Sequence, residues 1–203
     1  MTGVRFSSRI LRRFAETASL ELGAETFHAV LTMAGLPGEW ADPVTLARFD
    51  ASESAHAYAR LQAAMRTYYG RGARGVLLRV GNRLWRHLLE DAALGGKAQA
   101  ALIRGLPLAM RRKPALDLLA RFLSSYPGDV TIHMLDLELL LVDHTSPTVQ
   151  SYVDTSPICF ITRGLIREAL YWATGEEHDV EETSCRAMGA NACEFKIMVG
   201  GSS

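Results

Sequence analysis

The residues best suited to chemistry are three cysteines and one glutamate near the end of the chain. Cys159, Glu182, Cys185 and Cys193 are separated by 22, 2 and 7 residues. Thiolate sulfur and carboxylate oxygen both bind Zn²⁺, and four protein ligands complete its tetrahedral coordination. The residue types therefore suggest a structural zinc site, in which no position on the ion stays open for catalysis.

The spacing of these residues places demands on the backbone. Gly189 and Asn191, between the last two cysteines, are turn residues, so a hairpin can bring the two sulfurs together. Glu182 and Cys185 differ by three positions, which on a regular strand places their side chains on opposite faces. If both reach one ion, we expect the strand to bulge or break between them.

Two other interpretations of the cysteines stay open on the residues alone. Free cysteine is often a small core residue, so all three thiols could simply be buried. Alternatively, Cys185 and Cys193 could form a disulfide and leave Cys159 in the core, although disulfides are scarce in cytosolic proteins.

The tail also resembles a known family, the 4-vinyl reductase domain family. The resemblance rests on Pro157-Ile158-Cys159, which matches the start of the family's long helix, and on Glu182, Cys185, Met188, Gly189 and Cys193. The family includes relatives of bacteriochlorophyll-pathway proteins and the phenol-sensing modules of bacterial transcription activators. The resemblance implies that Cys159, Glu182, Cys185 and Cys193 bind zinc, as the corresponding residues of the phenol sensors do.

Composition restricts the class of protein. The chain has 203 residues, of which 48% are hydrophobic and 22% charged, as expected for one globular domain. Its 22 basic and 22 acidic residues balance, which gives no support for nucleic-acid binding. Because no apolar run is long enough to span a bilayer and no secretory signal is evident, we expect a cytoplasmic protein without membrane contacts.

The hydrophobic pattern predicts helices first and strands afterwards. Ser52 and Glu53 are suited to a helix start, and Pro114 predicts either a kink or two shorter helices. Helices are predicted at 5–21, 25–34, 52–69, 73–93, 97–104, 108–125 and 158–174, and strands at 130–134, 137–142, 178–185 and 193–199. This order predicts an α+β fold with N-terminal helices followed by a small antiparallel four-stranded sheet packed with long helices.

Two regions are expected. Residues 1–50 form an N-terminal helical segment, and residues 51–203 form the ligand-binding domain. In the phenol sensors such a segment is an assembly element, so the resemblance implies a homodimer. The alternative is a helical pair packed on its own domain.

Gly81, inside the helix at 73–93, costs about 1 kcal/mol relative to alanine and is expected to permit close approach of a backbone or a ligand.

Six residues are candidates for contact with a ligand, five of them because they combine an apolar body with a polar tip or add aromatic surface. Arg163 is the sixth, because it lies one turn after Cys159 and is able to pair with an anionic ligand, with Glu182 or with solvent. Ordinary core packing is the alternative for the others. The six are His133, Tyr152, Phe160, Arg163, Tyr171 and Trp172.

No motif in the sequence supports an enzyme. There is no glycine-rich dinucleotide fingerprint after a predicted strand, no flavin signature and no nucleophile elbow. We therefore predict a non-enzymatic sensor or carrier domain that binds an apolar or aromatic small molecule, such as a hydrocarbon, a phenol or a tetrapyrrole, and is stabilised by zinc. The resemblance leaves two alternatives: an accessory protein of bacteriochlorophyll biosynthesis that acts on or delivers a vinyl-bearing porphyrin, and a structural assembly module.

Overall fold

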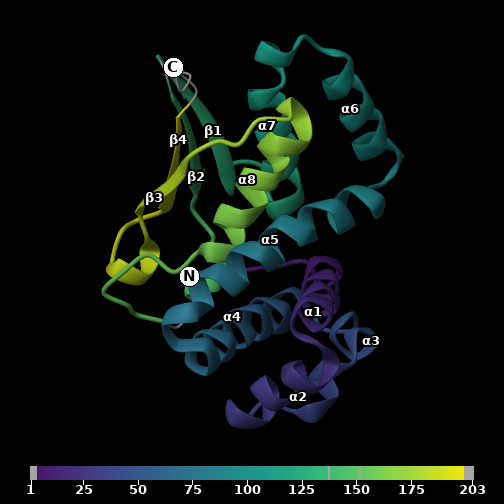
Figure 1. Ribbon diagram of the computed structural model, residues 1–203, viewed down its shortest axis with the longest axis vertical. Coiled ribbons are helices and arrows are strands. Elements are labelled where there is room, and N and C mark those ends of the chain that lie inside the picture. The colour runs from purple at the N-terminus through teal and green to yellow at the C-terminus, as the bar shows by residue number, and fades with distance from the viewer. Residues whose placement is uncertain (1–3, 137, 151, 199–203) are drawn as a thin grey trace.

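A computed structural model describes residues 4–136, 138–150 and 152–198, and it confirms the predicted α+β fold (Figure 1). The helices precede the sheet, apart from one helix inserted between the two strand pairs. The elements are α1 (Ser8–Leu22), α2 (Ala24–Met33), α3 (Pro43–Leu46), α4 (Ala51–Tyr69), α5 (Ala73–Glu90), α6 (Leu94–Gly105), α7 (Arg112–Leu123), β1 (Val130–Leu135), β2 (Glu138–Asp143), α8 (Phe160–Thr174), β3 (Val180–Ser184) and β4 (Cys193–Met198).

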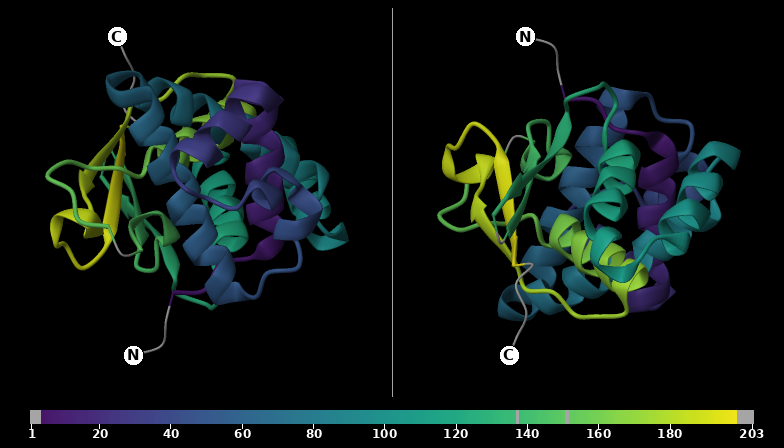
Figure 2. Two further views of the ribbon diagram at one scale, coloured as in Figure 1. Left: turned by 90° about the horizontal axis from the view of Figure 1, so that it is seen from below. Right: turned by 90° about the horizontal axis from the view of Figure 1, so that it is seen from above.

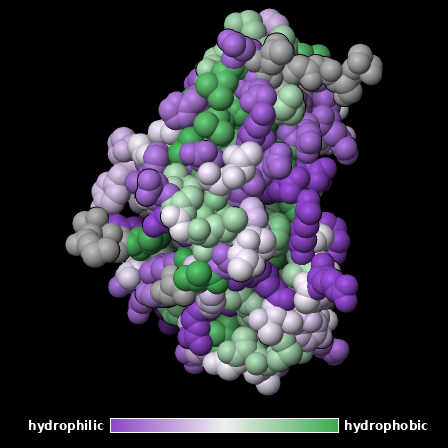
Figure 3. Space-filling view, turned by 90° about the vertical axis from the view of Figure 1, so that its left-hand side faces the viewer, coloured by the Kyte–Doolittle hydropathy of each residue, from purple (hydrophilic) through white to green (hydrophobic). Residues whose placement is uncertain are grey.

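The four strands form one antiparallel sheet in the order β1-β2-β4-β3. Alternate side chains such as Leu139, Leu141, Phe195 and Ile197 are buried, as expected for a sheet with one face on the core. The helices lie on that one side of the sheet (Figure 2). Across the face that includes the sheet side, hydrophilic side chains surround short hydrophobic stretches (Figure 3).

Helix α8 packs on α5 by direct backbone contact. A Cβ atom added at Gly81 of α5 would collide with the carbonyl oxygen of Ile161 in α8, and one added at Gly164 would collide with the carbonyl oxygen of Leu78. The expectation that Gly81 permits a close approach is therefore confirmed, and the neighbour is another backbone. This contact holds α8 in place beside the sheet.

The N-terminal segment packs on the rest of the chain. Phe6 and Phe14 contact Tyr58 of α4, with ring centroids 4.4 and 4.8 Å apart, and all three belong to the same core cluster as Phe195. Arg13 of α1 also pairs with Asp91 after α5. The packing accords with a helical pair on its own domain, while a dimerisation role for residues 1–50 stays a prediction.

Two helix starts differ from the predictions, and the alternative of two shorter helices around Pro114 is confirmed. Asp50, rather than Ser52, is the N-cap of α4, and its side chain forms a capping box with Glu53. Helix α6 begins before the glycine pair at 95–96, which occupies its first turn. Around Pro114 the chain forms two shorter elements: a 3₁₀ turn at Leu108–Met110, and α7, in which Pro114 lies in the first turn and disturbs no helical hydrogen bond.

Candidate metal centre

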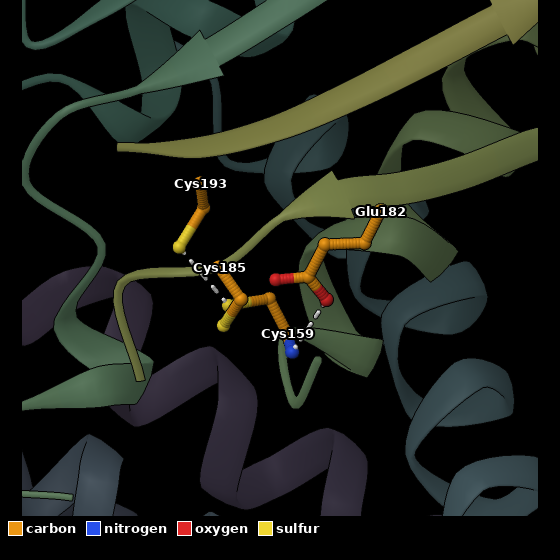
Figure 4. Close-up of side chains that lie close together, drawn as sticks. All are labelled: Cys159, Glu182, Cys185 and Cys193. Carbon is orange, nitrogen blue, oxygen red and sulfur yellow. Dashed lines mark hydrogen bonds between the residues drawn. The ribbon is translucent and has the colours of Figure 1, made fainter. Parts of the chain in front are cut away.

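The structure brings the three cysteines and the glutamate to one point (Figure 4). Cys159 is the N-cap of α8, Glu182 points inward from β3, Cys185 follows β3, and Cys193 begins β4. One ligand atom from each residue lies within 4.8 Å of the others, and all four residues are buried. The four therefore form a buried Cys₃Glu cluster between a helix start and the β3–β4 hairpin.

The strand between Glu182 and Cys185 is irregular, as the sequence requires. Glu182 pairs with Phe195, but Ser184 pairs with Glu194, so the register of β3 shifts between them. A bulge of this kind lets residues an odd number of positions apart face the same side. The expected bulge is confirmed, and Glu182 and Cys185 both point into the cluster.

Only one of the two carboxylate oxygens of Glu182 accepts a hydrogen bond from a described protein group. Its Oε2 accepts a hydrogen bond from the backbone N–H of Cys159 at 3.0 Å. Among the described residues, no partner lies within hydrogen-bond distance of its other oxygen, Oε1, which is buried. An unsatisfied buried carboxylate oxygen costs free energy, and a bound cation would remove that cost.

The sulfurs are close but not bonded to one another. The Sγ atoms of Cys159 and Cys193 are 3.5 Å apart, and all three cysteines are free thiols, so the structure contains no disulfide between them. The backbone N–H of Arg186 donates to Cys193 Sγ at 3.4 Å, and Ser146 Oγ lies 3.7 Å from Cys159 Sγ. The thiols are buried as the core interpretation requires, yet that interpretation leaves the adjacent carboxylate unexplained.

Without a bound cation, the four acidic groups of this cluster do not all ionise. Hydrogen bonds from Cys159 and Cys193 lower the pKa of Cys185, so Cys185 is the thiolate that the cluster favours. Hydrogen bonds to Cys185 and Cys193, together with burial, raise the pKa of Cys159. In the metal-free cluster these effects outweigh the N-terminal end of α8, which favours ionisation of Cys159.

The remaining two groups are also held protonated. Burial raises the pKa of Glu182 to about 8, and the neighbouring Cys185 adds to the shift. For Cys193, the hydrogen bond with Cys159 lowers the pKa, but the hydrogen bond with Cys185 and burial outweigh it and raise the pKa to about 12. Four ionisable ligands packed this closely become jointly anionic only if a cation compensates them, which is the condition that a metal site meets.

A cleft of about 560 Å³ lies beside the cluster. It runs between the first turn of α5, the segment before α8, the first turn of α8 and the entry to β3. One metal-ligand candidate, Glu182, contributes to its wall. Its lining residues are Arg74, Ser156, Pro157, Phe160, Arg163, Asp179, Glu181 and Glu182.

Only two of the six predicted ligand contacts, Phe160 and Arg163, line this cleft. His133 is exposed on β1, where it bonds Thr131 Oγ1 at 2.9 Å, and Tyr171 is 48% exposed on α8. The half-buried Tyr152 has Arg66 over its ring at 5.7 Å. Trp172 packs edge-on against Trp85, with ring centroids 5.7 Å apart. The six therefore do not line one cleft, because Tyr171 and Trp172 lie about three turns after Phe160 on α8, and His133 and Tyr152 lie outside α8.

Two neighbours of the site were not predicted from the sequence. Arg74 faces the cleft from α5, and its distance in sequence from Arg163 gives no signal of their proximity. Asp143 is buried opposite Cys193 in the strand register, and burial raises its pKa to about 6. The alternation of β2 predicts an inward side chain at this position, and an acidic residue there is the signal that could have identified it.

The fold and the cluster together define an α+β domain with a buried group able to hold a metal. Residues 144–199 match the family model of the V4R domain, which is the 4-vinyl reductase domain that the tail resembles. The matched range includes all four residues of the cluster. A search of curated proteins finds no match.

Several solved structures share the fold at low sequence identity. A trafficking protein particle complex subunit 3 from Naegleria fowleri, covalently bound to palmitic acid, aligns with a TM-score of 0.52 and 16% identity over 72% of this chain and 93% of that one. An H-NOX protein from S. oneidensis aligns with a TM-score of 0.52 and 15% identity over 97% of each chain. At these identities the likeness concerns the fold alone.

The phenol-responsive sensory domain of the transcription activator PoxR, solved with phenol, is also similar. It aligns with a TM-score of 0.49 and 15% identity over 70% of this chain and 74% of that one. As for the membrane, none of the helices within the described ranges is long and apolar enough to cross a bilayer.

Proposed function

We propose that this chain is a non-catalytic small-molecule-binding module, a sensor or carrier, whose V4R part is stabilised by one structural zinc ion. The observation that carries the proposal is the convergence of three sulfurs and one carboxylate oxygen within 4.8 Å, with Glu182 Oε1 lacking any described partner. Three thiolates select a soft or borderline metal, and zinc accepts the added carboxylate.

In this proposal zinc supplies positive charge to a cluster that cannot carry its own negative charges, and it links α8 to the β3–β4 hairpin. Cys159 holds the helix start, Glu182 and Cys185 hold the bulged strand, and Cys193 holds the start of the neighbouring strand. Four protein ligands leave the ion no open position, so its role would be structural.

The cleft beside the cluster is the ligand site in this proposal. Its volume of about 560 Å³ lies in the range of small-molecule pockets, and Phe160 and Pro157 supply apolar surface. Because Glu182 belongs to both the cluster and the cleft wall, the metal would also fix the shape of that wall. A second groove of about 350 Å³, between the start of α7 and the β1–β2 turn, has no such connection to the cluster.

Metal analysis of protein purified without chelators tests the zinc site. We expect about one zinc per chain in the wild type and little in Cys185→Ser. Glu182→Gln should bind zinc more weakly in a competition titration with a chromophoric chelator. Its matched control, Glu181→Gln, removes an adjacent carboxylate that is exposed, and it should bind zinc as the wild type does.

Cobalt substitution gives a second readout. Co²⁺ held by three thiolates in a tetrahedral site should show thiolate charge-transfer bands and intense visible absorption, which Cys185→Ser should lose. A wild-type protein without metal under reducing conditions, or equal zinc in the wild type and Cys185→Ser, would contradict the proposal.

A further inference from the structure

The cleft contains two arginines without carboxylate partners. Arg163, in the first turn of α8, and Arg74, in the first turn of α5, both line it. Among the described residues, neither guanidinium has a carboxylate oxygen within 4.0 Å, whereas Arg13, Arg79, Arg83, Arg86 and Arg112 each form such an ion pair. Neither arginine is therefore committed to an ion pair with a described residue.

Arg163 is held in place although it lacks a partner. It is half buried, and its Nε atom is shielded from solvent with no hydrogen-bond partner among the described residues. Burial lowers the pKa of Arg163, and the nearby charge of Arg74 lowers it further. A guanidinium in this position is stabilised by an anion that accepts hydrogen bonds in its plane.

The acidic residues of the cleft restrict the charge of such an anion. Asp179 and Glu181 are exposed and line the same cleft, so a multiply charged group such as a triphosphate would be repelled. Glu182 is already used in the metal cluster. Asp179 and Glu181 already offset the charges of the two arginines, so the cleft favours a single anionic group that accepts guanidinium hydrogen bonds over a multiply charged one.

The remaining walls suit an apolar body. Phe160 is half buried beside Arg163, and Pro157 lies next to it on the segment before α8. A carboxylate on an aromatic or aliphatic skeleton would place its charge at the arginines and its skeleton on Phe160.

We infer that this cleft binds a small monoanionic organic acid, whose carboxylate is held by Arg163 and Arg74 and whose apolar part lies against Phe160. The inference rests on the proposed binding function and names the chemical class of its ligand. It adds Arg74, from the helix that precedes the V4R match, to a site otherwise built by the V4R part.

Titration of the whole zinc-loaded chain with benzoate, followed by backbone amide chemical shifts, tests the inference. Benzoate should shift the amides of residues around 156–163 and 179–182 and bind at one site. Benzamide, which has the same ring without the charge, should bind about tenfold or more weakly. Inorganic phosphate serves as a charge-only probe and should also bind more weakly than benzoate, because it lacks the apolar body.

Arginine variants locate the contact. Arg163→Gln and Arg74→Gln should each weaken benzoate binding by about ten- to a hundredfold. Arg163→Lys keeps the charge, loses the planar fork and should give an intermediate loss. The control, Arg167→Gln, removes one positive charge from α8 four residues later and lies against a different pocket, so it should bind benzoate nearly as the wild type does. Circular dichroism and zinc content verify that each variant is folded.

Three results would overturn the inference: no saturable benzoate shift, equal binding of benzamide, or an equal loss in Arg167→Gln. Zinc measured in the same samples separates the two proposals. If zinc is present and benzoate does not bind, only the inferred class of ligand is contradicted. If benzoate binds through the arginines in a protein without zinc, the metal proposal falls and the cleft stands.

Discussion

Helix α8 is held in two places by different physical means. At its start, Cys159 joins the Cys₃Glu cluster with β3 and β4. One turn further, Gly164 packs on Gly81 of α5 with no side chain between the backbones. The cluster consists of ionisable groups that could hold a cation, while the glycine crossing is apolar and contains no ionisable group. One attachment should therefore respond to chelators and pH, and the other should respond only to side-chain volume.

The largest expected effect comes from breaking the cluster. Cys159→Ser removes the ligand that α8 supplies, so zinc should be lost and the free energy of unfolding should fall by about 3–5 kcal/mol, or about 10 °C in melting temperature. Thermal unfolding with and without EDTA measures it. The wild type should become less stable with EDTA, whereas the variant should not respond. A wild type that is insensitive to prolonged chelation at raised temperature would argue against the comparison.

A somewhat smaller effect is expected from breaking the crossing. Gly81→Ala inserts a methyl group against the Ile161 carbonyl, and the helices must separate, at a cost of about 2–3 kcal/mol. Denaturant unfolding measures this loss, and metal analysis should still find zinc at the wild-type level. The exposed helical Gly75, where an added Cβ meets only the end of the Arg79 side chain, provides the control: Gly75→Ala should be neutral or stabilising. Loss of zinc in Gly81→Ala would show that the two attachments are not independent.

The contribution of Glu182 to stability should depend on pH with opposite signs in the two metal states. Glu182 has a pKa raised from its ordinary value of 4.5 to about 8 in the metal-free fold. Its protonated form is therefore favoured by folding, and the Glu182 contribution to metal-free stability should be greatest below pH 4.5 and fall as pH rises toward 8. Cys185, whose pKa is lowered, contributes in the opposite sense over this range. Zinc-bound stability should rise over the same range, because protons compete with the metal for thiolates.

Urea unfolding at several pH values, with and without zinc, measures both slopes. Glu182→Gln should remove the Glu182 contribution from the metal-free protein, so that its stability rises with pH through the remaining contribution of Cys185. Asp143, whose pKa is raised to about 6 by burial, contributes below that pH in the same sense as Glu182. An equal effect of Glu182→Gln on the slopes with and without zinc would contradict the assignment of Glu182 as a ligand.

The smallest effect should come from a site that belongs to neither attachment. Asp50→Ala removes the capping box at the start of α4 and should cost about 1 kcal/mol. The loss should be the same with and without EDTA and unchanged in the Gly81→Ala background, as expected for distant sites. A double-variant cycle measures this, and a coupling well above the error would mean that α4 participates in holding α8.

Local chemistry made much of the fold predictable. Gly128, Gly175 and the turn residues at 189 and 191 separate the strands and helices, and the observed elements lie close to the predicted ranges. The bulge between Glu182 and Cys185 could also be anticipated, because two ligands of one ion cannot face opposite sides of a strand. The residues that contact a small molecule were harder to predict. His133 and Tyr171 have suitable side chains, but orientation relative to a cleft depends on packing between distant elements.

The sequence alone determined which residues could form a metal cluster, where helices give way to strands, and that Gly81 needs a close neighbour. These properties follow from residue type, from period and from spacing along a short stretch of chain. The tertiary structure alone decided that Arg74 and Arg163 share one cleft, that Phe160 faces it while Trp172 packs against Trp85, and that Glu182 keeps one oxygen without a protein partner. Proximity across such separations is set by how α5, α8 and β3 pack, and no local pattern encodes that packing.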